Sequence, residues 1–455
     1  MNLPALGLFS GRYNAYLCAP LKPSFQRQSR WGLSIVWAML CSGCSRPGTV
    51  VNRPFVDSLL DQFALPSLVR TNAAEIQFWE KKREADPGDS GAWENLSNRL
   101  LMRYRLLGDI GALGEADRLL STYSSGFAGK DPILPLSRAA VRLLQQRFPD
   151  AASFAVMAGY WGGQKKLVSE AIFDADIGMG AFDSAGARLS LLRRDQDFGY
   201  YFRLGQWLSV EGFPDSAAAA YHLADSLALT SDFLRQLALS GRAEFSLARG
   251  DAQLAAGLSE SSIRLNPTDF ASLCRLGRIS WIVDRDDSLS GKIFHFLAGH
   301  WQTPEAFYWL SGWAGSQKDS GLQQQWADSC LFRINDSSFG NVGSRNAIGL
   351  CTGILHAPSQ AIAIAKKAVY RNACAQTYSW YVWALASGRQ ADSAALIFKE
   401  KVQGKWLGAQ ENYWMGNYLR AKGDAGLADS LLRVAYSQRM LLSLSEKEEL
   451  EGDFR

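Results

Sequence analysis

The stretch YFRLGQWLSVEGFPDSAAAAYHLADSLAL, Tyr201 to Leu229, decides how this sequence folds. Its small residues Gly205, Ala217 and Ala224 stand where two antiparallel helices can approach each other closely. Its large residues Tyr201 and Tyr221 fill the space between those helices. The stretch therefore predicts a packed pair of helices, and no strand-like alternation of apolar and polar residues interrupts it.

The spacing of these residues resembles the tetratricopeptide repeat (TPR). The positions that match its pattern are Leu204, Gly205, Gly212, Ala217, Tyr221 and Ala224. The same register recurs along the chain at separations that scatter around the TPR period of about 34 residues. The predicted units begin near Ser97, Pro132, Lys166, Phe198, Gln236, Phe270, Pro304, Val342, Cys374 and Ala409.

The likeness extends to a broad group of bacterial TPR proteins. Residues 76–120 resemble the opening units of that group, and residues 377–394 and 413–435 resemble its closing units. The resemblance implies an all-α fold, a TPR-type helix-turn-helix solenoid of about ten repeats over residues 71–444, wound as a right-handed superhelix. Residues 445–455 then form a polar C-terminal tail with a frayed end. Such motifs are specific for architecture and unspecific for activity.

The N-terminal region has the organisation of a secretory leader. Arg27 and Arg30 precede an uncharged run, residues 31–40, which is too short for the roughly 20 residues that cross a membrane as a helix. The sequence that follows, Leu40-Cys41-Ser42-Gly43-Cys44, resembles the lipobox of bacterial lipoproteins, although Cys41 stands where that family usually has leucine.

The lipobox implies that residues 1–43 are a cleaved signal peptide and that Cys44 carries the lipid anchor, with residues 44–70 as a tether containing at most one short helix. Ser45, in place of aspartate, favours an outer-membrane lipoprotein facing the periplasm. The alternatives are the cell surface, an inner-membrane anchor or an uncleaved signal anchor. A redox or zinc site at this C-x-x-C would need a surrounding βαβ unit or a second C-x-x-C, and the sequence has neither.

Charge argues against nucleic acid as a partner. The chain has 48 Lys and Arg against 44 Asp and Glu. Four of the basic residues, and no acidic residue, precede Cys44, so the mature chain is balanced at 44 against 44. A protein that binds nucleic acid needs a basic face that displaces counterions.

No motif predicts a catalytic, cofactor or metal site, and the sequence predicts a protein that is not an enzyme. The histidines are spread along the chain without H-E-x-x-H spacing, and no Walker loop or G-x-S-x-G occurs. The four cysteines beyond Cys44 are Cys274, Cys330, Cys351 and Cys374. Either Cys330 pairs with Cys351 in an oxidising compartment, or all four are small core residues.

The expected function is a membrane-anchored scaffold that mediates protein–protein interactions in the bacterial cell envelope. The alternatives are an envelope binding module for a glycan or small ligand, and a non-catalytic subunit of an envelope enzyme or secretion complex. A protein or peptide partner would bind in the concave groove, where aromatic and arginine side chains act as anchors. The TPR register assigns that groove to Phe202, Gln206, Arg278, Trp281, Tyr308, Asn346, Tyr413, Asn417 and Arg420.

Overall fold

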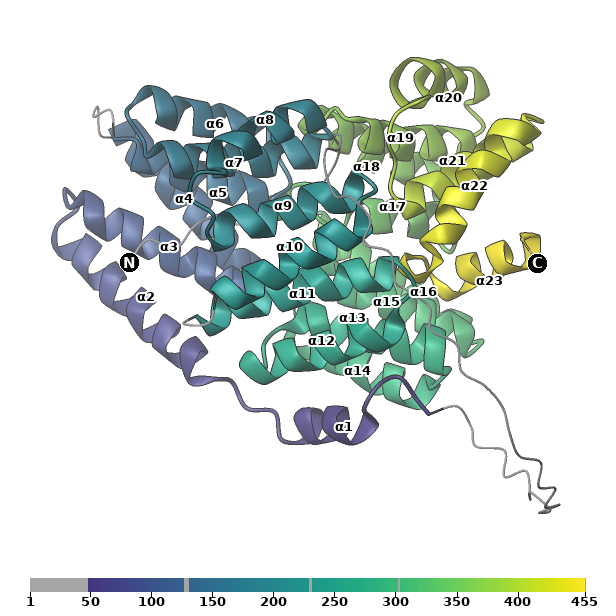
Figure 1. Cartoon of the computed structure of the whole chain (residues 1–455), viewed down its shortest axis with the longest axis horizontal. Helices are drawn as coiled ribbons and strands as arrows, with labels where there is room; N and C mark the ends of the chain where they lie inside the picture. The colour runs from purple at the N-terminus through teal and green to yellow at the C-terminus, as the bar shows by residue number, and fades with distance from the viewer. Residues whose placement is uncertain (1–47, 127–130, 229–230, 302, 455) are drawn as a thin grey trace, which may run out of the picture.

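The computed structural model describes residues 48–126, 131–228, 231–301 and 303–454. Those residues form 23 α-helices and no strand. Figure 1 shows how the helices are arranged. The predicted signal peptide, residues 1–43, and Cys44 lie outside the described residues.

Twenty of the helices form ten consecutive pairs, each an A helix followed by an antiparallel B helix. The pairs are α3 (Ser90–Leu107) with α4 (Ile110–Gly126), α5 (Ile133–Leu144) with α6 (Phe148–Tyr160), α7 (Lys165–Met179) with α8 (Phe182–Leu192), α9 (Phe198–Val210) with α10 (Pro214–Leu227), α11 (Asp232–Ala248) with α12 (Ala252–Leu265), α13 (Phe270–Ile279) with α14 (Asp287–His300), α15 (Pro304–Ser316) with α16 (Ser320–Ile334), α17 (Ser344–Thr352) with α18 (Pro358–Arg371), α19 (Ala375–Ser387) with α20 (Ala391–Ile397), and α21 (Ala409–Ala421) with α22 (Ala425–Ser437). The all-α solenoid of about ten repeats is therefore confirmed.

A glycine followed by an aspartate forms several of the turns between the A and B helices of a pair. Gly250 and Gly423 have φ of 84° and 83°, a left-handed conformation that glycine adopts without a steric penalty. The next residue, Asp251 or Asp424, accepts a hydrogen bond from the backbone N–H three positions later, at 3.0 and 3.3 Å. The glycine ends helix A and the aspartate caps helix B, so the chain reverses within a few residues.

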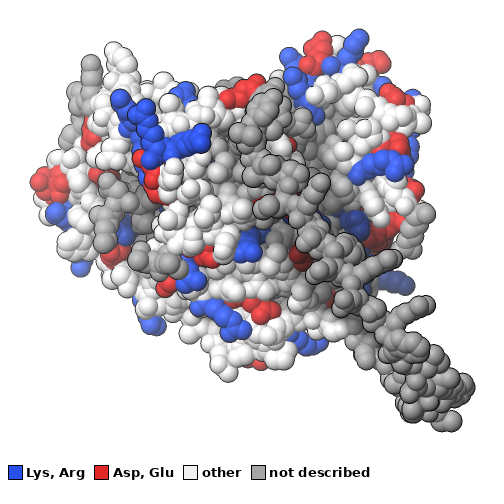
Figure 2. All heavy atoms as spheres, in the orientation of Figure 1, with Lys and Arg blue, Asp and Glu red and all other residues white. Residues whose placement is uncertain are grey.

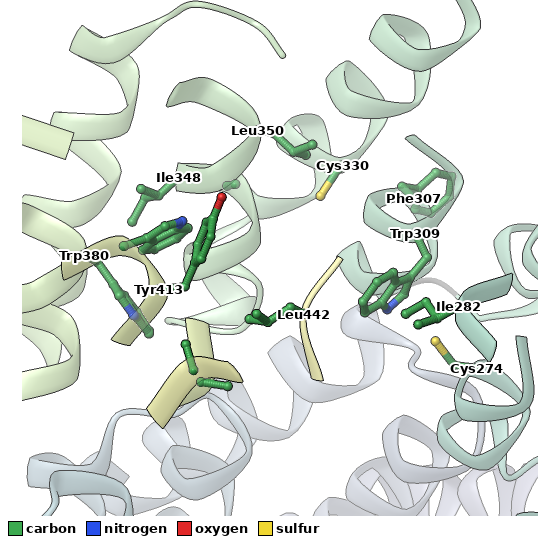
Figure 3. Packing of buried hydrophobic residues seen from close by; sticks show 14 of the residues in the cluster. Cys274, Ile282, Phe307, Trp309, Cys330, Ile348, Leu350, Trp380, Tyr413 and Leu442 are labelled. Atoms are coloured by element: carbon green, nitrogen blue, oxygen red, sulfur yellow. The ribbon is translucent and has the colours of Figure 1, made fainter. Parts of the chain in front are cut away.

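The solenoid coils so tightly that its second turn packs on its first. The Asn341 backbone N–H donates to the Gln145 carbonyl at 2.9 Å, and the Asn372 side chain donates to the Gly178 carbonyl, 194 residues away, at 3.3 Å. Leu442 is fully buried between Tyr413 on one side and Trp309 on the other (Figure 3). Much of the concave side is consequently filled by the protein itself.

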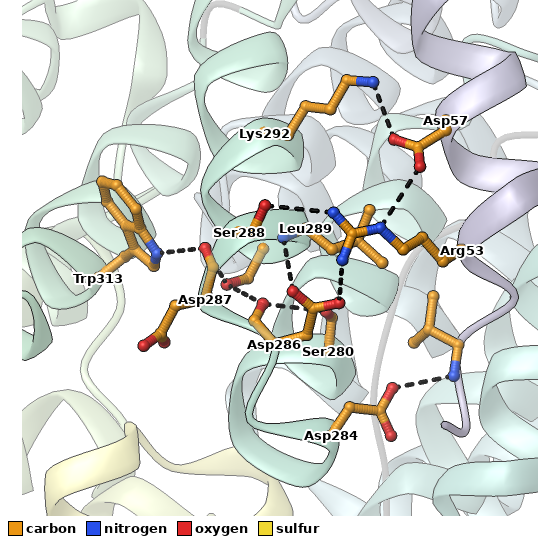
Figure 4. A network of polar contacts seen from close by, with 12 residues as sticks. Arg53, Asp57, Ser280, Asp284, Asp286, Asp287, Ser288, Leu289, Lys292 and Trp313 are labelled. Carbon is orange, nitrogen blue, oxygen red and sulfur yellow. Dashed lines mark hydrogen bonds and ion pairs between the residues drawn. The ribbon is translucent and has the colours of Figure 1, made fainter. Parts of the chain in front are cut away.

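The expected tether is a docked element. Residues 50–63, which include α1 (Arg53–Asp61), pack against α12 and α14, and we call them the N-terminal strap. The Asp284 carboxylate accepts from the backbone N–H groups of Val50 and Val51 at 2.8 and 3.0 Å. Lys292 pairs with Asp57 at 2.8 Å (Figure 4), and Val56 is fully buried. Helix α2 (Ser67–Ala85) then leads into the first pair.

The expected polar tail is a capping helix. Helix α23 (Leu444–Asp453) begins one repeat length after α21 and buries Lys447 and Leu450. Gln410 of α21 donates to Glu446 at 2.6 Å, and Tyr413 donates to Glu449 at 2.6 Å. Both contacts span 36 residues, about one TPR period, so α23 occupies the place of the next A helix and presents a polar outer face.

Candidate functional site: an aromatic cavity on the concave side

A cavity of about 490 Å³ lies among the A-helix sides of the last five units and the start of α23. Six aromatic side chains line it, together with uncharged polar groups, one arginine and two glutamates. The lining residues include Trp281, Tyr308, Trp309, Ser316, Arg345, Asn346, Gly349, Thr352, Trp383, Gln410, Tyr413, Trp414, Glu446 and Glu448.

One wall of the cavity depends on a π-helical turn, η1 (Ser280–Asp284), that extends α13. This turn carries Trp281, whose indole Nε1–H donates to Ser316 Oγ at 3.2 Å. A Cβ on Gly312 would lie 3.1 Å from the Trp281 ring, so glycine at that position leaves room for the indole. Trp281 is consequently held in one orientation.

The opposite wall is a pair of stacked indoles. The rings of Trp383 and Trp414 are 5.7 Å apart and parallel within 1°. Trp383 donates to Thr352 Oγ1 at 3.0 Å, and Gly349 lets α17 approach Trp414, where a Cβ would lie 3.3 Å from the ring. Offset stacking of this kind stabilises aromatic pairs by about 0.5–1.5 kcal/mol beyond their burial.

Arg278 supports the floor without entering the cavity. Its guanidinium lies 4.8 Å from the ring centroid of Trp309 and donates to the Met440 carbonyl at 3.3 Å. It also lies 3.6 Å from a carboxylate oxygen of Glu244. The arginine thus ties the sixth unit to the segment before α23.

The rim toward α23 is acidic. Glu446 accepts from Gln410, and Glu448 pairs with Arg285 at 2.9 Å. Burial and the hydrogen bond to Glu449 raise the pKa of Tyr413, and burial raises the pKa of Tyr308, so both phenols stay neutral at physiological pH.

The structure brings together four of the nine predicted groove residues: Trp281, Tyr308, Asn346 and Tyr413 all line the cavity. Arg278 lies behind Trp309, outside the lining.

The remaining four groove residues lie elsewhere. Asn417 and Arg420 continue along α21, where Arg420 pairs with Asp453 at 2.6 Å. Phe202 and Gln206 are buried, with Phe202 stacked on Phe198 at 5.5 Å, and neither lines this cavity.

Sequence reasoning did not assign Trp309, Trp383, Trp414 or Gln410 to the groove, although all four line the cavity. The residues contributed by Ser443–Glu448 had no sequence signal as part of this site. Their place depends on how α23 folds back along the concave side.

The four cysteines beyond Cys44 are small core residues with free thiols, and Cys330 forms no disulfide with Cys351 in the structure. Cys274, Cys330, Cys351 and Cys374 are all free and buried. Among the described residues, no group of His, Cys, Asp and Glu is arranged to hold a metal ion. No helix in the described ranges is long and apolar enough to cross a membrane.

Comparison with known proteins yields similarity of fold alone. No protein-family description matches the chain, and no curated protein matches it. Among solved structures, the APC/C hetero-tetramer Cut9–Hcn1 matches with 14% identity and a TM-score of 0.45, over 83% of this chain and 68% of that one. Yeast Tom70 matches with 12% identity and a TM-score of 0.44, over 84% of this chain and 93% of that one.

Proposed function

We propose that this protein is a non-catalytic scaffold that holds a partner protein by a segment inserted into the aromatic cavity. The observation that supports this proposal most strongly is that six aromatic side chains line one cavity. Aromatic residues dominate the binding energy of protein interfaces because they bury a large area with few rotatable bonds. A volume of about 490 Å³ accommodates a few side chains of a partner segment.

We further propose that lipid on Cys44 attaches the scaffold to the bacterial envelope, at the outer membrane and facing the periplasm. The support is the lipobox-like sequence, with Ser42 and Gly43 before the cysteine. Several acyl chains make such an attachment stable, whereas one chain gives only marginal binding. On the face drawn in Figure 2, the described residues mix basic and acidic side chains and form no large patch of one sign. The surface charge therefore gives no support for nucleic acid as a partner.

In-cell crosslinking followed by pull-down and mass spectrometry tests the scaffold. The cavity variant combines Tyr308→Ser with Asn346→Ala, since both side chains are partly exposed and line the cavity. The matched control is Tyr370→Ala on α18, a tyrosine that is 91% exposed on a B helix. We expect one envelope protein to be captured by the wild type and the control and lost from the cavity variant.

Retention of that partner by the folded cavity variant would contradict the proposed site. Capture of no protein, together with binding of neutral glycans to the wild type, would favour the glycan-binding alternative. The anchor is tested separately with Cys44→Ala, which we expect to abolish incorporation of labelled palmitate and to accumulate as a slower precursor on a gel. Unchanged labelling and mobility would rule out lipidation at this residue.

A further inference from the structure

We infer that the segment received by the cavity carries a lysine or arginine side chain. This inference rests on the proposed function and specifies the chemistry of the partner. It follows from three properties of the cavity: the excess of carboxylates among its lining residues, its aromatic faces, and its polar groups that make no hydrogen bond to any described residue.

Carboxylates outnumber cations among the residues that line the cavity. Glu446 and Glu448 line it, whereas Arg285, which pairs with Glu448, does not. Among the lining residues the one cation is Arg345, and its guanidinium is 3.9 Å from the Glu411 carboxylate. An anionic ligand would face this surplus of negative charge, whereas a cation would relieve the repulsion.

Glu448 has the capacity to accept a cation. Its side chain is 55% exposed, and its Oε1 atom pairs with Arg285 at 2.9 Å. Within the described parts of the chain, no hydrogen bond to the Glu448 carboxylate accompanies this ion pair. A carboxylate can accept several hydrogen bonds, so an incoming ammonium or guanidinium group finds unused acceptor capacity at the rim.

The aromatic walls suit the same charge. The faces of tryptophan and tyrosine rings attract cations, by about 0.5–2 kcal/mol according to how far the cation is desolvated. The protein already uses this interaction beside the cavity, where Arg278 lies over the ring of Trp309.

Uncharged polar groups complete the match to a peptide rather than to an isolated amine. The Tyr308 hydroxyl, the Asn346 amide and the Trp414 indole N–H make no hydrogen bond within the described residues, while Trp281 and Trp383 are already engaged. A peptide offers backbone carbonyl and N–H groups to the free set, and its basic side chain can reach the carboxylates. A neutral sugar would add no positive charge beside these carboxylates.

Fluorescence titration of the full chain tests the inference, because four tryptophans line the cavity. The probe is the tryptophan-free peptide acetyl-Gly-Lys-Gly-Lys-Gly-amide. The comparison peptides carry acetyl-lysine or glutamate at the two lysine positions. We expect saturable binding of the lysine peptide, at least about tenfold weaker binding of both comparison peptides, and weakening with added salt.

Two variants separate charge from structure at the rim. Glu448→Gln and Arg285→Ala both remove the ion pair between α23 and the body, but only the first removes negative charge from the cavity. We expect Glu448→Gln to weaken binding of the lysine peptide by about threefold to tenfold, and Arg285→Ala to leave it equal or tighter. Equal loss in both variants would show that the pair acts only by holding α23 and would overturn the charge role.

The outcomes also separate this inference from the proposed function. If the glutamate or acetyl-lysine peptide binds as tightly as the lysine peptide, the inference is wrong, although the cavity still binds peptides. If no peptide binds below about 1 mM while the cellular partner is still lost from the cavity variant, the inference is wrong and the scaffold stands. If the cellular partner is also unaffected, both fail.

Discussion

At the scale of single residues, Gly205 shows why the repeat needs glycine at one contact between helices. A Cβ added there would lie 2.9 Å from ring atoms of Tyr221, which is itself buried. Gly257, in the middle of α12, has nothing within 4 Å of the same added atom. Packing against Tyr221 therefore requires glycine at position 205, whereas no packing contact requires it at position 257.

Alanine substitution should therefore have opposite effects at these two positions. Gly205→Ala should destabilise the fold by about 1–3 kcal/mol, because overpacking outweighs the gain in helix propensity. Gly257→Ala should stabilise it by up to about 1 kcal/mol, because alanine loses less conformational entropy in a helix. Urea unfolding midpoints measure both effects, and shifts of the same sign would contradict the packing argument.

A second prediction concerns Glu244, which lies beside Arg275 and Arg278. Burial alone would raise the pKa of Glu244, but the two guanidinium groups outweigh burial and lower this pKa to about 2. The ordinary value, about 4.3, applies to the unfolded chain. The carboxylate therefore contributes stability that is present above about pH 4.3 and is lost as the pH falls toward 2.

The stability advantage of the wild type over Glu244→Gln should be largest at neutral pH and should shrink below about pH 4.3. Denaturation midpoints across this pH range measure it. Asp215→Asn is the control, because the Asp215 side chain is 93% exposed in its pair with Arg249 and should show little difference at any pH. An advantage for Glu244 that stays constant down to pH 3 would disprove the role of the two arginines.

At the scale of elements, the π-helical turn η1 joins three parts of the molecule. Its Trp281 lines the cavity, and its Asp284 accepts the backbone N–H groups of the N-terminal strap. Arg285, which follows the turn with φ of 57°, pairs with Glu448 of α23. π-Turns inside α-helices are uncommon and occur often at functional sites. Here Trp281 and Asp284 of one short turn serve the cavity and the strap, and the residue that ends the turn contacts α23.

The strap should undock when its buried anchor is made polar. Val56→Asp places a carboxylate in a fully buried, apolar position, where losing its hydration is costly. Ser58→Asp is the control, because it changes an exposed position of the same helix. Hydrogen exchange of residues 53–63 should accelerate at least tenfold in Val56→Asp and stay near the wild-type rate in Ser58→Asp. Slow exchange in Val56→Asp would show that the polar contacts alone hold the strap.

At the scale of the whole molecule, contacts between the two turns of the solenoid should make its unfolding more cooperative. Gly340 has φ of 65°, and an added Cβ would lie 2.1 Å from the Gln145 carbonyl oxygen of the first turn. Gly404 has a similar φ of 73°, with nothing within 4 Å. The pair of glycines thus separates backbone strain from loss of the contact between turns.

Gly340→Ala should lower the free energy of unfolding more than Gly404→Ala does. The second substitution carries only the penalty of about 1–2 kcal/mol for an alanine in the left-handed conformation. The extra cost should appear as reduced cooperativity, because repeats that contact only their neighbours unfold in parts. Calorimetry should show a broadened or split transition for Gly340→Ala and a single shifted one for Gly404→Ala. A single sharp transition in both would mean that the turns fold independently of this contact.

Repeat positions were predictable because their signals are local. The predicted starts at Phe198, Phe270, Pro304 and Ala409 coincide with helix starts, and glycine–aspartate turns separate several A and B helices. The first unit was placed near Ser97, but its A helix begins at Ser90, because the small-residue pattern marks a packing position inside a helix rather than its end. Phase within a helix also indicated which positions face inward, and four of those positions line the cavity.

The sequence by itself determined the all-α architecture, the repeat and the inward phase of each A helix, because those properties depend on residues a few positions apart. Tertiary structure decided which inward positions stay open. The strap, the contacts between turns and the position of α23 join residues separated by 36 to 234 positions, and no local period reports such contacts. For that reason Phe202 and Trp281, equivalent in sequence reasoning, differ in the molecule: only Trp281 reaches the cavity.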